Sequence, residues 1–293
     1  DEVVRTQVLA VLEPYINSPI IRSATPIGLT GADEDGFEAG AARIELISGR
    51  VDTVFWSADP TIERTTEDGF RFAGRFGLWA EQDGEPLSVS LVGGTVLEKN
   101  GRGIALEAGE FAAEITAVDH GEHSITISPA PEAPAAMIGK TIFIGNDKRS
   151  LAYEVTSVEP ADGGVRLSLS MDSRIGTGQV TGTEDHRVLT DTPFHLQRWG
   201  YYEGARIRSA NGAAEYRINE VRNAGFALID AEQHPDATAE ALAGEFAEGT
   251  WFEVFDYGVG DTVRWPMSAS ATRRSAHTWE MSTGGGARVS LPQ

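Results

Sequence analysis

Hydrophobic and polar residues alternate in short runs along most of the chain. Clear runs with a period of two residues, bounded by Gly, Asp or Asn, occupy residues 42–47, 70–76, 124–127, 153–158 and 165–170. Successive side chains of a β-strand point to opposite faces of its sheet, so this pattern is typical of strands with one buried face. Short strands at regular spacing, with turn residues between them, predict an all-β fold built from antiparallel sandwiches or barrels.

Only one segment has the character of a helix. Residues 239–246 follow Asp236 and Thr238, either of which can cap a helix N-terminus, and acidic residues stand in the first turns. The segment is long enough for two or three turns, which suits a surface connection. We therefore expect almost no helix in the rest of the chain.

A proline-rich segment interrupts the strand pattern. Residues 128–136 contain three prolines, which a central strand does not accept because proline has no backbone N–H to donate. We place a domain boundary here. The expected domains are an antiparallel β-sandwich at residues 1–128 and a second β domain, sandwich-like or barrel-like, at residues 137–293.

The second predicted domain contains two similar strand–turn–strand units. The first comprises residues 139–142, 153–158 and 164–167, and the second comprises residues 204–207, 216–221 and 225–228. A hairpin signal, Asn146-Asp147 or Asn211-Gly212, stands between the first two strands of each unit. Either the chain is internally duplicated, with units that stack on a shared core, or antiparallel strands resemble one another by chance.

Composition narrows the classes of partner. The chain has 293 residues, 44 acidic against 24 basic residues and a net charge of −20, and only three of the bases are lysine. Nucleic-acid binding needs a dominant basic face, so this charge argues against it. A polysaccharide partner, neutral or anionic, remains open where arginines cluster. No apolar run approaches the roughly 18–20 residues of a membrane span.

Two further features bear on the compartment. The chain begins at Asp1 rather than at a methionine, so we expect either a removed signal peptide or a fragment of a longer chain. Both fit a secreted, periplasmic or cell-surface protein. Cysteine is absent, which excludes disulfides, thiol catalysis and cysteine-based zinc sites.

No motif defines a complete active site. The sequence has neither the G-x-S-x-G elbow of a serine hydrolase nor an H-E-x-x-H zinc motif. His120 and His123, together with Asp119, could hold a metal, but turn residues of this kind are usually just solvated, and we favour a solvated hairpin turn. We predict no metal and no cofactor, and the catalytic residues, if there are any, stay unassigned.

The most informative stretch is residues 191–206, which concentrate aromatic and basic side chains. Sugar rings stack on aromatic faces, and arginine or histidine can hold carboxylates and hydroxyls. The alternative is core packing, because alternation sends adjacent tyrosines to opposite faces of a strand. The predicted substrate-binding residues are His195, Arg198, Trp199, Tyr201, Tyr202 and Arg206.

A second aromatic cluster at residues 251–263 alternates cleanly. Phe252 and Val254 face one way, while Trp251, Glu253 and Phe255 face the other. The pattern predicts a strand that leads through a glycine turn into the next strand.

Several short segments of the sequence resemble one known family. Residues 8–15 with 20–23, residues 72–77 with 91–95, and residues 255–261 are similar to the C-terminal β region of bacterial heparinase II/III-like proteins. The resemblance implies a polysaccharide lyase in which an α/α toroid carries most catalytic residues and packs against a β-sandwich. This chain has no long amphipathic helices for a toroid, and none of its residues matches a catalytic residue of the family.

Three functions follow in order of preference. The first is an accessory, non-catalytic β region of a secreted polysaccharide lyase, which supports a carbohydrate-binding cleft and has a catalytic toroid outside this chain as its partner. The second is a free-standing carbohydrate-binding or surface protein. The third is a small, complete β-fold lyase acting on uronic-acid glycans, built around His195, Arg198, Tyr201 or Tyr202.

Overall fold

The structure is a computed structural model that describes residues 10–14, 18–31, 38–191, 200–222, 225–283 and 287–291. The chain forms two compact units. Unit 1 comprises Asp1–Phe111 and Pro266–Gln293, and unit 2 comprises Ala112–Trp265. The all-β fold class is confirmed, since strands and turns account for nearly all of the described structure.

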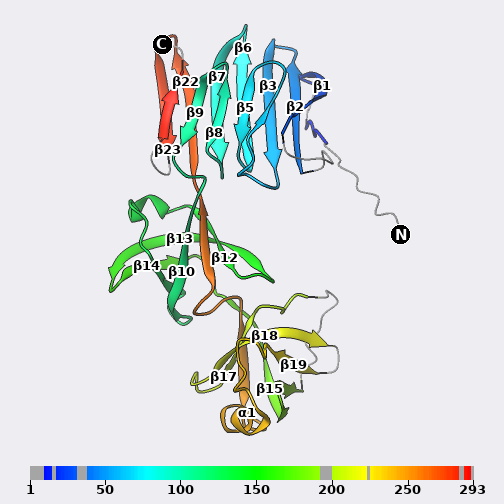
Figure 1. Cartoon of the computed structure of the whole chain (residues 1–293), viewed down its shortest axis with the longest axis vertical. Coiled ribbons are helices and arrows are strands. Elements are labelled where there is room, and N and C mark those ends of the chain that lie inside the picture. The colour runs from blue at the N-terminus through cyan, green and yellow to red at the C-terminus, as the bar shows by residue number, and fades with distance from the viewer. Residues whose placement is uncertain are drawn as a thin grey trace, which may run out of the picture. The chain divides into compact units, whose positions relative to one another are not determined.

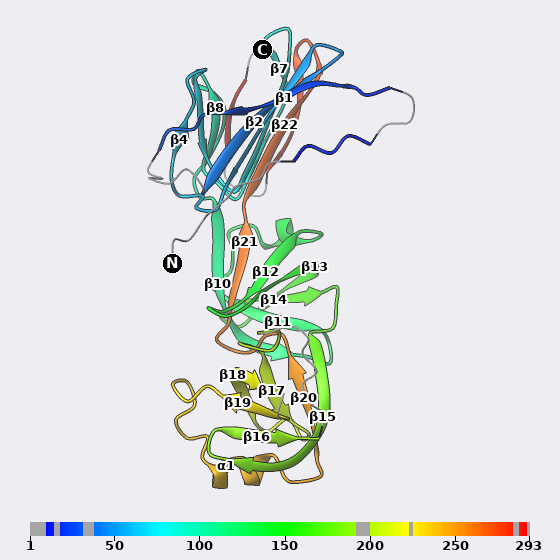
Figure 2. The ribbon, with the colours of Figure 1, turned by 90° about the vertical axis from the view of Figure 1, so that its right-hand side faces the viewer.

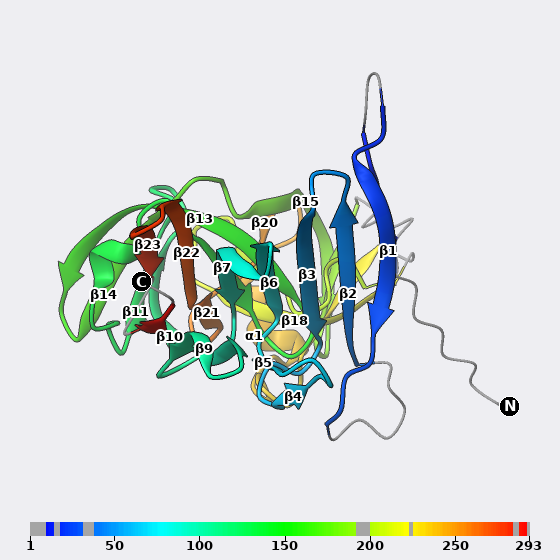
Figure 3. The same ribbon diagram turned by 90° about the horizontal axis from the view of Figure 1, so that it is seen from above.

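Unit 1 is an antiparallel β-sandwich. Figure 3 shows the order of its larger sheet, from β23 at one edge to β1 at the other. This seven-stranded sheet comprises β1 (Ile21–Ile27), β2 (Ala39–Leu46), β3 (Arg50–Ser57), β6 (Phe76–Gln82), β7 (Glu85–Val92), β22 (Ser268–Ser275) and β23 (Thr278–Thr283). The five-stranded sheet comprises β24 (Ala287–Ser290), β9 (Arg102–Leu106), β8 (Val96–Lys99), β5 (Phe70–Ala73) and β4 (Arg64–Thr65).

The two sheets enclose one hydrophobic core. Figure 2 shows β4 and β8 on one side of unit 1 and β2 and β22 on the other. The larger sheet contributes Phe55, Trp79 and Leu91, while the smaller sheet contributes Phe70 and Phe72. The ring centroid of Phe55 lies 5.1 Å from that of Phe70 and 5.2 Å from that of Phe72. This alternation of inward apolar residues is what holds the two sheets face to face.

Unit 2 contains two closed six-stranded barrels (Figure 1). In the order in which the strands pair, the first barrel comprises β10 (Glu110–Asp119), β11 (Ser124–Ser128), β14 (Gly164–Leu169), β13 (Ser150–Ala161), β12 (Thr141–Gly145) and β21 (Thr262–Pro266). The second barrel comprises β15 (Arg174–Glu184), β16 (Arg187–Thr190), β19 (Phe226–Ile229), β18 (Glu215–Arg222), β17 (Arg206–Ser209) and β20 (Trp251–Phe255).

The two barrels share one topology. When the strands of each barrel are numbered along the chain, their order around the barrel is first, second, fifth, fourth, third, sixth in both cases. The predicted strand–turn–strand units are the third to fifth strands of the two barrels, so the internal repeat is confirmed. The second barrel is inserted between the fifth and sixth strands of the first, and α1 (Ala239–Glu245) occupies the corresponding place in the second.

Local irregularities repeat as well. Register shifts interrupt the first and fourth strands of both barrels, between Ile115 and Ala117, Val180 and Gly182, Val155 and Ser157, and Ile218 and Glu220. The turn after each first strand ends in a histidine with positive φ, 48° for His123 and 57° for His186. The carbonyl groups of these histidines accept from Leu169 N–H and Ile229 N–H respectively. The two barrels therefore repeat in local detail as well as in strand order.

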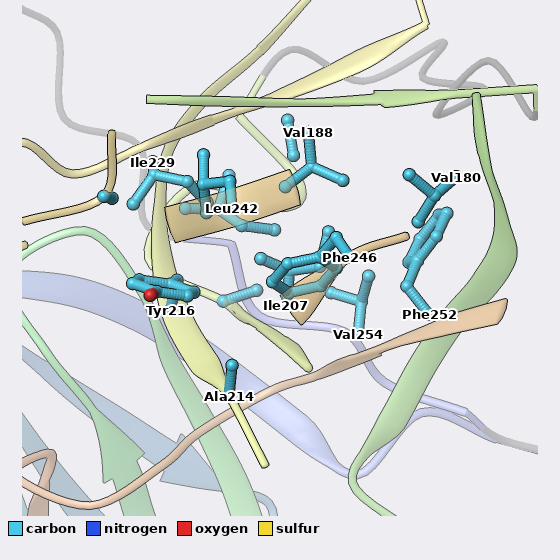
Figure 4. Packing of buried hydrophobic residues seen from close by; sticks show 14 residues of the cluster. Val180, Val188, Ile207, Ala214, Tyr216, Ile229, Leu242, Phe246, Phe252 and Val254 are labelled. Atoms are coloured by element: carbon cyan, nitrogen blue, oxygen red, sulfur yellow. The ribbon is translucent and has the colours of Figure 1, made fainter. Parts of the chain in front are cut away.

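The single predicted α-helix is present and closes the second barrel. Thr238 is its N-cap and accepts a hydrogen bond from Ala241 N–H. Figure 4 shows Leu242 of this helix and Phe246 beyond it among barrel residues such as Val188 and Ile229. The helix forms where it does because Thr238 satisfies a free N–H group and Leu242 is buried in the barrel core.

The proline-rich segment lies inside unit 2. It connects β11 to β12 and includes a 3₁₀ turn, Pro134–Met137, whose Met137 side chain is fully buried. The chain passes between the units at residues 111–112 and 265–266 instead. Unit 1 takes β22, β23 and β24 from the C-terminal end of the chain, so unit 2 is an insertion into the sandwich.

Candidate functional site

Unit 2 contains a pocket to which both barrels contribute. Its volume is about 370 Å³, within the range typical of small-molecule sites. The first barrel supplies the turn between β10 and β11, and the second supplies the start of β15 together with β17 and β20. The lining residues are His120, Gly121, His123, Asp172, Arg174, Arg208, Glu253 and Phe255.

A stacked pair of rings supports the pocket. The His120 and Phe255 ring centroids are 3.7 Å apart, with an angle of 13° between the planes. His120 Nδ1 lies 2.9 Å from the Ser173 hydroxyl oxygen, which fixes the orientation of the imidazole. His120 is only 8% exposed, and its buried Nε2 makes no hydrogen bond, although Glu215 Oε2 lies 3.5 Å away. The imidazole therefore holds Phe255 in place across the two barrels.

The two arginines of the pocket differ in their charge balance. Arg174 donates to Glu253 at 2.9 Å and has an Asp172 carboxylate oxygen at 3.7 Å, so two carboxylates neutralise it. The guanidinium carbon of Arg208 lies 5.9 Å from the Phe255 ring centroid. Within the described ranges Arg208 forms no ion pair with a carboxylate. Arg208 is thus the cation that the pocket can offer to an anion.

The turn before β18 leaves room for Arg208. Gly212 has a φ of +68°, and a Cβ atom at this position would stand 2.4 Å from Arg208 Nη2. The Asn211-Gly212 turn, predicted from the sequence as a hairpin signal, therefore provides both a left-handed turn conformation and space for the guanidinium group.

Of the predicted substrate-binding residues, the structure describes Tyr201, Tyr202 and Arg206, and none of these three lines the pocket. His195, Arg198 and Trp199 fall outside the described residues. Tyr201 is 46% exposed, and its ring meets the ring of Tyr202 edge to face at 5.0 Å. Tyr202 is half-buried against the core of the second barrel. Burial raises the pKa of its hydroxyl.

Arg206 is buried rather than open to a ligand. Its Nη2 donates to Asp261 Oδ1 at 2.5 Å and to the Val259 carbonyl oxygen at 3.2 Å. Arg208 is two residues further along the same strand and lies just beyond the stretch that the sequence singled out. Alternation along β17 could have identified it, since Arg206 and Arg208 share a face.

Ionic contacts fasten the two barrels together beside the pocket. Arg149 of the first barrel pairs with Asp256, which also accepts a hydrogen bond from the Tyr153 hydroxyl at 2.5 Å. Asn146 Nδ2 donates to Asp261 Oδ1 at 3.1 Å and to the Gly204 carbonyl at 2.9 Å. Burial raises the pKa of Asp256, while the Tyr153 hydrogen bond and the Arg149 charge oppose that rise.

The pocket depends on this junction between the two barrels. Each barrel alone contributes only part of the lining, so the pocket exists because the two barrels are held in one arrangement. Buried, hydrogen-bonded charges fix such an arrangement, since any shift would leave a charge without its partner.

His234 makes the junction sensitive to acid. Its Nε2 accepts the Arg217 N–H at 3.1 Å, and Arg217 pairs with Asp147 of the first barrel. Burial, followed by the charge of Arg206, lowers the pKa of His234 below its ordinary 6.5. The unfolded chain therefore binds a proton at a pH where the folded chain does not.

We expect this histidine to cost stability as the pH falls below about 6.5, with full stability retained above that value. The test is urea unfolding of the chain and of His234→Gln between about pH 5 and pH 7. The wild type should lose more unfolding free energy over this interval than the variant, whose amide oxygen can still accept the Arg217 hydrogen bond. Equal losses would contradict the assignment.

The described residues also bear on metal binding and on membrane-spanning helices. No group of three or more histidine, aspartate or glutamate side chains there is placed to hold a metal ion. Among the same residues, no helix has the length and apolar character that crossing a membrane requires.

The fold and the pocket together define an all-β protein in which duplicated barrels, inserted into a sandwich, share a small polar site. No protein-family model matches the chain, and comparisons with curated proteins and with solved structures found no match either.

Proposed function

We propose that this chain is a non-catalytic carbohydrate-binding region whose unit 2 pocket takes an acidic sugar. The observation that carries the proposal is Arg208, which extends over Phe255 in the pocket without a carboxylate partner among the described residues. A guanidinium group binds a sugar carboxylate through paired hydrogen bonds.

The rest of the lining favours a sugar over other anions. Asp172 and Glu253 present carboxylate oxygens that can accept hydrogen bonds from hydroxyl groups, and His123 adds a further polar group. Asp172 and Glu253 are paired with Arg174, so Arg208 is the guanidinium group of the lining that a ligand carboxylate can pair with. A ligand with one negative charge and several hydroxyls fits this single cation, whereas a polyphosphate or a nucleic acid would meet repulsion from the carboxylates and from the net charge of −20.

Two of the groups that could act as a base at the pocket, on Tyr257 and His120, are enclosed, which favours binding over β-elimination, while His123 lines the pocket as the remaining candidate base. A lyase needs a general base that reaches the proton next to the sugar carboxylate. The buried Tyr257, whose ring centroid lies 5.9 Å from that of His120, has its pKa raised to about 12 by burial, and its hydroxyl is enclosed. The nitrogen of His120 that is free of hydrogen bonds is also enclosed. The resemblance to heparinase II/III-like proteins adds the proposal that the binding serves a polysaccharide lyase whose toroid lies outside this chain.

The test is calorimetric titration with the tetrasaccharides of galacturonate, guluronate and hyaluronan. We expect at least one to bind, and Arg208→Ala to weaken its affinity about tenfold or more, since a hydrogen bond to a charged group contributes about 1.5–3 kcal/mol. Arg187→Ala is the matched control, because Arg187 is half-exposed and pairs with Glu184 away from the pocket.

The methyl ester of the tetrasaccharide that binds tests the contribution of the carboxylate charge, because esterification removes that charge and keeps the sugar rings. It should bind wild type about as weakly as the free acid binds Arg208→Ala. Failure of all three acids to bind would contradict the proposal. Release of an unsaturated product, followed by its ultraviolet absorbance, would replace it with the small-lyase alternative.

A further inference from the structure

Trp251 is the most exposed tryptophan among the residues that the structure describes. It begins β20 with 56% of its surface exposed. The alternate residues Phe252 and Val254 belong to the core of the second barrel. Trp251, Glu253 and Phe255 therefore share the outer face of the strand, as the sequence pattern predicted.

The same face connects Trp251 to the pocket. Glu253 and Phe255 line the pocket, and the rise of about 3.4 Å per residue puts Trp251 roughly 7 Å along the strand from Glu253 and roughly 14 Å from Phe255. On the neighbouring strand β15, Gln179 pairs with Trp251 and Thr177 pairs with Glu253. Polar residues of β15 thus lie beside Trp251 and Glu253 on one side of β20. On the other side of β20, Arg208 of β17 pairs with Glu253.

An indole in this place has a clear chemical use. An exposed tryptophan needs no explanation by itself, but an indole on the strand face that leads to a polar pocket offers the flat apolar surface on which a sugar ring can stack. The C–H face of a sugar ring packs on such a surface, while its hydroxyls reach the polar side chains at either side.

We propose that Trp251 is a second sugar subsite, so that the ligand is an acidic oligosaccharide lying along β20 with one carboxylate at Arg208. This inference rests on the proposed function and extends it from a single sugar to a chain. By the strand rise, Trp251 and Phe255, over whose ring the Arg208 guanidinium group lies, are about 14 Å apart along β20, a span that suits a short oligosaccharide better than a single ring.

The test measures affinity against chain length. The probe is the uronate series that binds in the tetrasaccharide experiment, from the monosaccharide to the hexasaccharide. For the wild type we expect affinity to rise with length, and for Trp251→Ala we expect the longer members to lose about two- to tenfold while the monosaccharide is unaffected. Trp251→Phe should recover part of the loss. Phe143→Ala, which removes an exposed aromatic ring from β12, should change nothing.

The outcomes separate this inference from the proposed function. If length has no effect on the wild type, or Trp251→Ala weakens all members equally, the second subsite is refuted while binding at Arg208 stands. If no member binds, the proposed function itself fails. Sedimentation without saccharide provides the remaining check. Loss of a dimer in Trp251→Ala would identify the indole as a contact between copies of the chain and overturn the subsite.

Discussion

Replacing Arg206 with methionine is expected to lower the free energy of unfolding of unit 2 by about 3–5 kcal/mol. The guanidinium group and its partner Asp261 are both almost fully buried, and their nearest N and O atoms are 2.5 Å apart. Methionine fills much of the volume of arginine but leaves the Asp261 carboxylate without its cation. A buried charge that has lost its partner is among the most costly changes a single substitution can make.

We expect the loss of unfolding free energy to arise because the buried Asp261 carboxylate is left without its cation. Removing an arginine at an exposed site should therefore have a much smaller effect. Arg187→Met removes an exposed ion pair with Glu184 and should cost about 1 kcal/mol or less. Adding Asp261→Asn to Arg206→Met should restore part of the stability, because the amide can still accept from Gly258 N–H without carrying a charge. The measurement is urea unfolding, with hydrogen exchange of β17 and β20 to assign the loss to unit 2. A cost below about 1 kcal/mol for Arg206→Met would contradict this role.

The same variant decides between two functions for Arg206. The sequence predicted that it contacts substrate, whereas the structure shows its guanidinium group held by Asp261 and Val259. At a temperature where Arg206→Met remains folded, we expect it to bind the acidic tetrasaccharide far better than Arg208→Ala does. Two arginines on one strand face would then have separate tasks, one in the junction between the barrels and one in the pocket.

Much of the fold follows from local patterns. Alternation predicts strands because one buried face is enough to define the period, and Asn146-Asp147 and Asn211-Gly212 mark hairpins because these residues favour the turn conformations. Thr238 begins the helix for an equally local reason. The two similar units are visible in the sequence because equivalent barrel strands bury equivalent positions.

The pairing of distant segments could not be predicted in the same way. The sandwich is completed by β22, which pairs with β7 across a gap that contains all of unit 2. The first barrel is closed by β21, which follows the entire second barrel. A strand pattern states which face is buried but not which strand lies beside it, so neither insertion is visible in local alternation.

The pocket could not be predicted from the sequence for the same reason, because it depends on contacts between segments that are distant along the chain. Its His120 and Phe255 come from different barrels and stack only after both have folded and joined. In the sequence, His120 reads as part of a turn and Phe255 as part of a strand, and both descriptions are correct. Their chemistry depends on the junction formed by Arg149, Asp256 and their neighbours, which no spacing along the chain reveals.

The second large effect is expected in unit 1, where Phe55→Ala should lower the free energy of unfolding by about 3–5 kcal/mol. Phe55 is 0% exposed and is the ring that meets both Phe70 and Phe72 of the opposite sheet. Its removal leaves a cavity between the sheets that their paired strands cannot close. The loss therefore includes the buried apolar area and the contacts of the surrounding rings.

Phe76→Ala is the matched control for this cavity, because it deletes the same side chain at a position in the same sheet that is 41% exposed. It should cost about 0.5 kcal/mol or less. Unfolding followed by the near-ultraviolet circular dichroism of Trp79, which stands edge-on to Phe70 at 5.6 Å, reports on this core directly. If the two variants were equally destabilised, Phe55 would not be the link between the sheets. A large difference would establish that the packing of the two sheets depends on these three rings, which join β3 of the larger sheet to β5 of the smaller one.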